Sequence, residues 1–344
     1  MVMHAKFFCI VLFTVISAIA APSGGFYANV SEELLISPSS AAMGGAVLSN
    51  GNGTTVESSP GNLPFDSLSR LSLAYAGFYN NAFSSSMLTY SGKPLENLGF
   101  SLMAGYIYIP DIVDTRGSTS NDSGELIEAK ESYFSASKIV FRAAVGRSFT
   151  VSPKITLGAG IAVNAKRSRL PETGYGIGCD AGISALFPGT GLSVALLVEN
   201  LTSSYIYWNE SFQERSYPHP RAGFGWYRNL PYIYGSLRLS YSSPDLLANE
   251  GINTYAKEIT DNENVIETPG VSEIYDKPSH LVTRGKFGLE YSIMNTVALR
   301  IGYSGYRFGF GGGVYLLGGR AGIDFAYLMH AMAGTYQLSA QYAW

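Results

Sequence analysis

The stretch Val297-Ala-Leu-Arg-Ile-Gly-Tyr303 shows the pattern that decides the fold of this 344-residue chain. Its odd-numbered residues are apolar or aromatic, and its even-numbered residues are small or charged. Because successive side chains of a β-strand point to opposite faces, such a strand has one apolar and one polar face. The same alternation recurs in residues 71–79, 98–108, 155–164, 287–291, 321–327 and 336–344. The pattern predicts an all-β protein.

The polar faces of these strands favour a membrane barrel over a soluble β-sandwich, which is the alternative. The solvent face of a sandwich usually carries many Lys and Glu residues. The polar face of these strands instead consists mostly of Gly, Ser and Ala. Charged residues make up only 14% of the chain, and its 24 tyrosines recur near strand ends. Tyrosines at those positions are typical of the aromatic girdles of an outer-membrane barrel.

The alternation predicts a single transmembrane antiparallel β-barrel of about fourteen strands over residues 69–344. An even number is the rule for single-chain bacterial barrels, which places the protein in the outer membrane of a Gram-negative-type bacterium. The expected strands are 69–80, 82–91, 97–109, 135–148, 153–166, 173–186, 191–201, 220–228, 234–243, 284–293, 296–305, 306–315, 319–329 and 334–344.

The lengths of the connections agree with this count. The three longest, 110–134, 202–219 and 244–283, are the third, seventh and ninth, and every even-numbered connection is short. Outer-membrane barrels have short periplasmic turns and longer outer loops, so we expect all three on the outer side. The longest loop carries acidic residues that could form a surface for a partner, namely Glu258, Asp261, Glu263 and Glu267.

The first 20 residues match a secretory signal peptide. Lys6 precedes an apolar run from Phe7 to Ile16, and Ala18-Ile-Ala20 provides a small-residue cleavage site. A transmembrane anchor is the alternative, but the run is shorter than the roughly 20 residues that a spanning helix needs. At the other end, the aromatic residues Tyr342 and Trp344 resemble the terminal signal that the barrel-assembly machinery reads.

Residues 21–68 do not alternate, and they contain short apolar pieces at 34–36 and 41–48. We interpret this segment as a plug or hatch folded into the barrel lumen, with a disordered periplasmic tail as the alternative. Small residues predicted to face the lumen would leave room for it, among them Gly176, Gly178, Gly182 and Ser184.

The sequence predicts no enzyme. It contains no catalytic, metal-binding or cofactor-binding motif, and its net charge of −3 does not suggest a nucleic-acid partner. Cys179 is interpreted as a small packing residue. Several charged residues fall on polar faces and should line the lumen, where they form either a selectivity lining or mutually paired charges, the interpretation we favour. They are Asp180, Glu199, Arg238, Glu290, Arg300, Arg320 and Asp324.

Two short elements before the first strand resemble the opening of the FadL/PorV-like outer-membrane barrels. They are Met43-Gly44-Gly45-Ala46 and Ser59-Pro60-Gly61-Asn62-Leu63, of which Pro60 and Leu63 match the family's Asn-Pro-Ala-Gly-Leu element. The strands at 287–291, 297–303 and 322–327 look like the closing strands of the PorV/PorQ type. The resemblance implies a fourteen-stranded FadL-type barrel in the lipid bilayer.

The resemblance implies two functions. A PorV/PorQ-like protein would bind partner proteins, or help to deliver or anchor them at the cell surface, in association with type IX secretion components. This is the function we favour from the sequence. A FadL-like protein would instead transport small hydrophobic molecules such as fatty acids through an apolar pocket between plug and wall.

Deletion of Tyr336–Trp344 should abolish the heat-modifiable gel mobility of a folded barrel. Without its last strand the barrel cannot close, and the open edge would leave backbone groups unpaired in lipid. A deletion of equal length within 244–283 is the control and should leave the mobility shift intact. A normal shift after the C-terminal deletion would show that these residues are not a barrel strand.

Overall fold

The computed structural model describes residues 34–51, 54–114, 132–209, 213–216, 218–246, 278–305, 307–330 and 333–344, with two short strands at 119–120 and 126–128. The predicted signal peptide and the acidic residues Glu258, Asp261, Glu263 and Glu267 lie outside these residues. Among the residues described, no helix is long and apolar enough to cross a membrane.

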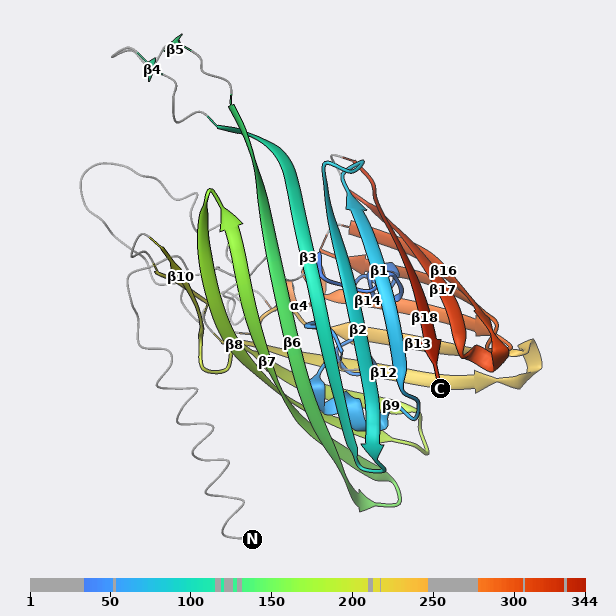
Figure 1. Ribbon diagram of the computed structural model, residues 1–344. Coiled ribbons are helices and arrows are strands. Elements are labelled where there is room, and N and C mark those ends of the chain that lie inside the picture. Colours follow the sequence, from blue (N-terminus) through green and yellow to red (C-terminus); the bar gives the residue numbers. More distant parts are fainter. Residues whose placement is uncertain are drawn as a thin grey trace, which may run out of the picture.

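Fourteen antiparallel strands close into one barrel (Figure 1). Each strand pairs with the next one of the set, and the last pairs with the first, from Arg70↔Ala343 to Gly77↔Tyr336. All fourteen predicted strands are present. They are β1 (Arg70–Phe78), β2 (Phe83–Leu95), β3 (Leu98–Asp114), β6 (Ser132–Ser152), β7 (Ile155–Leu170), β8 (Glu172–Phe187), β9 (Leu192–Glu199), β12 (His219–Leu230), β13 (Gly235–Ser242), β14 (Lys286–Ile293), β15 (Val297–Ser304), β16 (Arg307–Leu316), β17 (Ala321–Met329) and β18 (Thr335–Ala343).

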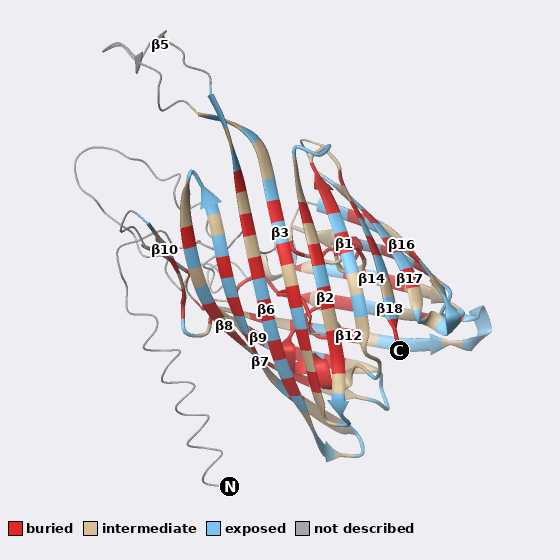
Figure 2. Ribbon diagram, in the orientation of Figure 1, coloured by how far each residue is buried: buried red, intermediate tan, exposed pale blue. Residues whose placement is uncertain are grey.

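The strands alternate between an exposed outer face and a buried inner face, as Figure 2 shows along β3 and β6. Most of the large apolar residues of the strands are on the exposed face, which is the arrangement that a lipid surround requires. The predicted register is therefore confirmed. Leu299, Ile301, Phe325 and Leu338 point outward, and Arg300, Asp324 and Gln337 point inward.

The strands differ in length around the ring. Strands β3, β6, β7 and β8 have 16 to 21 residues, whereas β13, β14 and β15 have 8 each. One side of the barrel therefore extends farther toward the outer end. A hairpin of β4 (Thr119–Ser120) and β5 (Leu126–Glu128) belongs to the connection between β3 and β6.

We had predicted a loop for the seventh connection, 202–219, but it contains two strands. They are β10 (Ser204–Trp208) and β11 (Gln213–Ser216), which pair with each other. Strand β10 also pairs with β8, beyond the residues of β8 that pair with β9. Strand β9 is interrupted after Glu199, where Asn200 and Ser203 adopt positive φ angles of 52° and 60°. The chain then resumes along the same edge, because the outer half of β8 would otherwise lack a partner on that side.

A Leu338→Arg variant should lose about 2–4 kcal/mol of unfolding free energy, because Leu338 is exposed near the middle of β18 and faces the hydrocarbon core. The matched control is Leu316→Arg at the periplasmic end of β16, which should cost about 0–1 kcal/mol near the interface. Guanidinium titration in lipid vesicles, followed by tryptophan fluorescence, measures both. Equal costs would contradict the assigned membrane position.

Candidate functional site

Residues 34–65, called here the inner segment, lie against the inner face of the barrel wall. Their side chains are mostly buried, and four buried anchors illustrate this: Leu35, Met43, Leu48 and Leu63. The contacts of the inner segment involve all fourteen strands of the ring. The described part of the segment therefore spans the cross-section of the barrel.

Local sequence explains the first half of the inner segment. Helix α2 (Pro38–Ala42) begins at Ser37, whose hydroxyl accepts the Ser40 N–H, and Pro38 occupies its first turn. The helix ends in a Schellman motif, in which the N–H of Gly45 donates to Ser40 O (2.8 Å) and that of Gly44 to Ala41 O (2.9 Å). Both glycines have positive φ angles, of 66° and 74°. The Met-Gly-Gly element is thus a helix stop.

The second half repeats this capping. The 3₁₀ helix η2 (Pro60–Phe65) begins at Ser59, whose side chain accepts the Gly61 N–H, and again has a proline in the first position. Asn62 donates from Nδ2 to Leu48 O (2.9 Å), which ties η2 to the first half of the segment. The predicted plug residues Met43, Gly44, Gly45, Ala46, Pro60 and Leu63 are all buried.

Glycines of the wall provide the space that the inner segment occupies. A Cβ at Gly302 would lie 2.6 Å from Met43 Cα, and one at Gly288 would lie 2.7 Å from Met43 O. On the opposite wall, a Cβ at Gly99 would lie 2.5 Å from Leu63 C. No side chain fits at such distances, so the backbone of the segment packs directly on the backbone of the strands.

The glycines of β8 serve two different elements, which partly corrects the prediction. Gly182 lies against Ser59 and Pro60, and Ser184 Oγ is 3.1 Å from Ser59 Oγ, as expected for seats of the inner segment. Gly176 and Gly178 instead lie against residues of β10. A Cβ at Gly176 would lie 2.9 Å from Ile206 Cγ1, and one at Gly178 would lie 2.7 Å from Ser204 Oγ.

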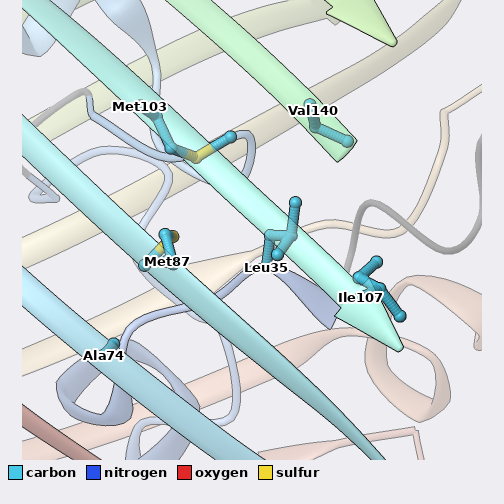
Figure 3. Close-up of a cluster of buried hydrophobic side chains, with 6 residues drawn as sticks. All are labelled: Leu35, Ala74, Met87, Met103, Ile107 and Val140. Carbon is cyan, nitrogen blue, oxygen red and sulfur yellow. The ribbon is translucent and has the colours of Figure 1, made fainter. Parts of the chain in front are cut away.

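An apolar patch lines the inner face of the wall where β1, β2, β3 and β6 run side by side. We call it the methionine patch; it consists of Ala74, Met87, Met103, Ile107 and Val140. Leu35 of the inner segment packs into its centre (Figure 3). Leu34 is partly buried against the same patch. Inward positions of a membrane barrel are ordinarily polar, so this patch departs from the rule.

A second leucine of the inner segment has different surroundings. Leu48 is fully buried against Ala195 and Leu197 of β9, and its N–H donates to Ser242 Oγ (3.2 Å). Nearby, Asn50 Nδ2 donates to Ser240 Oγ (2.6 Å). This contact combines small residues with hydrogen bonds, whereas the methionine patch consists of flexible apolar side chains.

Charged side chains on the inner face pair with one another. Arg300 donates to Glu290 Oε2 (2.6 Å), to Asp324 Oδ1 (2.6 Å) and to the Tyr315 hydroxyl (2.5 Å). Arg238 also approaches Glu290, with Nη1 3.2 Å from Oε1. Two carboxylates and two guanidiniums thus neutralise each other, which supports the interpretation of mutual pairing over a selectivity lining.

Two further charged groups follow the same principle. Asp180 accepts from Arg142, from Asn164 Nδ2 (2.9 Å) and from the backbone N–H of Asn200 (3.0 Å). Arg221 pairs with Glu199 at the outer end of β9. Removing one partner from such a buried pair leaves an uncompensated charge, so these groups constrain the wall as units.

One ion pair joins the inner segment to the wall. Lys286 Nζ lies 3.5 Å from Glu57 Oε1, beside the Gly44–Gly45 turn. Glu57 is almost fully buried and Lys286 largely so. This contact adds an electrostatic tie to an interface that otherwise depends on close backbone packing.

Six of the seven predicted lumen charges lie on inward positions of their strands: Asp180, Glu199, Arg238, Glu290, Arg300 and Asp324. Arg320 does not. It follows the 3₁₀ turn η5 (Leu317–Gly319), is exposed and precedes β17, so it lies outside the regular alternation. The predicted strand, 319–329, began two residues too early, because β17 begins at Ala321.

Among the inward polar residues, Arg142 and Tyr315 were not predicted, whereas the alternation over 155–164 had already put Asn164 on the polar face. Arg142 and Tyr315 have the same parity as the small residues of their strands, so the alternation could have found them. The partners could not be found that way, because they come from neighbouring strands. Among the residues described, no group of three or more His, Cys, Asp or Glu side chains is arranged to hold a metal ion.

Neither a protein-family model nor a curated protein matches the chain. Among solved structures, a TodX monoaromatic hydrocarbon channel carrying the deltaS2S3 change is similar to it, with 12% identity and a TM-score of 0.51. The likeness covers 90% of this chain and 98% of that channel.

Two other structures are similar to a lesser degree. The Pseudomonas putida toluene transporter TodX has 13% identity over 90% of this chain and 97% of its own, with a TM-score of 0.49. A Pseudomonas aeruginosa FadL homologue has 10% identity over 93% and 99%, with a TM-score of 0.46. At such identities the first likeness establishes a shared fold. With its closed antiparallel barrel and apolar outer face, the chain is an outer-membrane protein of a Gram-negative-type bacterium.

A Gly302→Ala variant should displace the inner segment, because the added methyl group would collide with the backbone of Met43 and Gly44. Overpacking of this kind costs about 1–3 kcal/mol. We expect faster proteolytic cleavage between residues 34 and 65, measured on the protein in detergent. Gly312→Ala is the matched control, since a Cβ there would meet only Ala298 O at 3.4 Å. Equal cleavage rates in the two variants would show that the inner segment does not pack against Gly302.

Proposed function

We propose that this protein is an outer-membrane channel for small apolar molecules, with the inner segment as its plug and the methionine patch as part of the pathway. The observation that carries the proposal is a patch of large, flexible apolar side chains on an inner wall that elsewhere presents mostly small or polar residues, with Leu35 buried at its centre. In this proposal residues 1–20 are the signal peptide, 21–68 the plug and 69–344 the barrel.

The chemistry of the patch suits an apolar ligand of variable shape. Met87 and Met103 have flexible, polarisable side chains, which adapt to different ligands at low cost. A pocket that binds small molecules is mostly apolar and has few polar groups. If Leu35 moves away, an apolar solute can occupy its place and bury a comparable surface.

The plug role follows from the position of the inner segment. It contacts every strand of the ring, so a solute must displace part of it or pass beside it. The contact with the methionine patch is made by side chains, and we take it as the exchangeable one for that reason. Leu35 fills the space beside Gly105 and Ser85 Oγ donates to Leu34 O (3.3 Å), whereas η2 packs backbone to backbone against the wall.

One similar structure supports the transport hypothesis. The structure with a TM-score of 0.51 is a monoaromatic hydrocarbon channel. The PorV/PorQ-like role in partner binding, which we favoured from the sequence, has no such support. It depended on the resemblance, and the acidic residues offered as a partner surface, Glu258, Asp261, Glu263 and Glu267, lie outside the described residues. We therefore favour transport of small apolar molecules over partner binding.

A Leu35→Ala variant should admit apolar solutes faster, because it removes the side chain that fills the methionine patch. We expect the uptake rate of an apolar dye, N-phenylnaphthylamine, to rise several-fold in cells that express the variant. The truncation should also cost about 2–5 kcal/mol of stability, as buried leucine truncations do. Gel mobility must therefore confirm that the barrel is folded.

Leu48→Ala is the matched control. Leu48 is as deeply buried as Leu35, at 0% against 1% exposure, but it packs on β9 rather than on the methionine patch. A general loosening of the plug would raise uptake equally in both variants and would also raise the uptake of a polar dye of similar size. Such a result would contradict an apolar pathway at Leu35.

A further inference from the structure

Two arginines face outward at the outer end of β7. Arg167 and Arg169 are exposed and share a strand face with the lipid-facing residues Ile161 and Val163. The end of the strand at Leu170 is the outer end, because the opposite end leads into the short turn to β6. The arginines therefore continue the lipid-facing surface toward the outer membrane boundary.

Strand register places Arg167 among outward-facing tyrosines of the neighbouring strands. The row across the wall reads Tyr207, Tyr175, Arg167, Ile139 and Tyr106. The three tyrosines are about half exposed, as expected for side chains at a membrane interface. The Arg167 guanidinium carbon lies 5.9 Å from the centre of the Tyr175 ring, so the ring faces the cation.

Arg169 lies one row farther out, between hydroxyl side chains. Its neighbours across the strands are Ser137 on β6 and Thr173 on β8, with Tyr108 beyond Ser137. Residues two apart on one face of a strand are about 7 Å apart, so the two guanidiniums can reach the same ligand. The group offers two cations and several hydroxyls in one small area.

Among the described residues, neither arginine forms a salt bridge or a side-chain hydrogen bond. The adjacent positions across both neighbouring strands are Ser, Ile, Tyr and Thr, and no carboxylate faces the pair. Glu172, the nearest acidic residue on β8, has the parity of the inward-facing positions. Two outward-facing guanidiniums are thus left without a hydrogen-bond acceptor among the described side chains.

We propose that Arg167 and Arg169 bind the phosphate groups of a phosphorylated glycolipid of the outer leaflet. Guanidinium binds phosphate through paired, charge-assisted hydrogen bonds, and Arg is better suited to this geometry than Lys. The hydroxyls of Ser137 and Thr173 supply partners for sugar oxygens. The acyl chains lie along the exposed belt below, over Ile161, Val163 and Phe141.

This lipid site is independent of transport. The arginines point away from the lumen and do not contact the inner segment. It also differs from the other outward arginine on these strands. Arg147 lies near the periplasmic end of β6, with its guanidinium carbon 5.6 Å from the Phe149 ring, and so faces the other leaflet. Arg147 is therefore a natural control.

The test uses the full-length mature protein in a non-ionic detergent and native mass spectrometry. The probes are bisphosphorylated lipid A, its enzymatically dephosphorylated form and phosphatidylglycerol. We expect the unaltered protein to retain lipid A, and retention to fall about fivefold for each of Arg167→Ala and Arg169→Ala. Arg147→Ala should retain lipid A normally. Heat-modifiable mobility establishes that each variant is folded.

Three results would overturn the proposal. Normal lipid A retention by the Arg167→Ala/Arg169→Ala double variant would show that the arginines do not bind it. Equal retention of the dephosphorylated glycolipid would show that phosphate is not recognised. Equal retention of phosphatidylglycerol would show a general affinity for anionic lipids rather than for the glycolipid of the outer leaflet.

Discussion

The need to pair every backbone N–H and C=O group within the protein is the constraint on which the rest of this structure depends. The hydrocarbon core of a membrane offers no hydrogen-bond partner, so a sheet can persist there only if it closes. The pairing of β1 with β18 meets that requirement, and it continues to Trp344, whose N–H donates to Ser69 O (2.9 Å). Closure then forces one face of every strand toward lipid and the other toward the lumen.

Closure also creates an interior that must be filled or hydrated. The inner segment occupies this space by packing backbone on backbone at Gly302, Gly288 and Gly99, and by burying leucines against two different walls. Buried charges of the inner face pair across neighbouring strands, as Arg300 does with Glu290 and Asp324. The methionine patch stands out against this background, since its five wall side chains are apolar, although Arg142 and Lys138 are the cross-strand neighbours of Met103 and Ile107. That contrast is why we assign the pathway to Leu35 rather than to Leu48.

Much of the candidate site could be predicted from the alternation. A period of two assigns each residue to lipid or lumen, so the inward positions of Asp180, Glu290, Arg300 and Asp324 followed from parity alone. Arg320 was misplaced because parity holds only inside a strand, and the chain there enters a turn. The β10–β11 hairpin was missed because its strands are short. Its position depends on the part of β8 that extends beyond β9 and needs another strand to pair with. Gly176 and Gly178 were assigned to the plug for the same reason.

The sequence by itself determined the strand count, the register and the faces, because these depend on local alternation and turn spacing. It also determined the two capped turns of the inner segment, through Ser37-Pro38, Gly44-Gly45 and Ser59-Pro60. Only the tertiary structure decided which wall each part of that segment meets, and which charges pair. Those contacts join different elements of the fold, 10 positions apart for Arg300 and Glu290 and 194 for Leu48 and Ser242, and local propensity has no information about them. The gathering of Ala74, Met87, Met103, Ile107 and Val140 around Leu35 exists only because four strands lie side by side in the closed barrel.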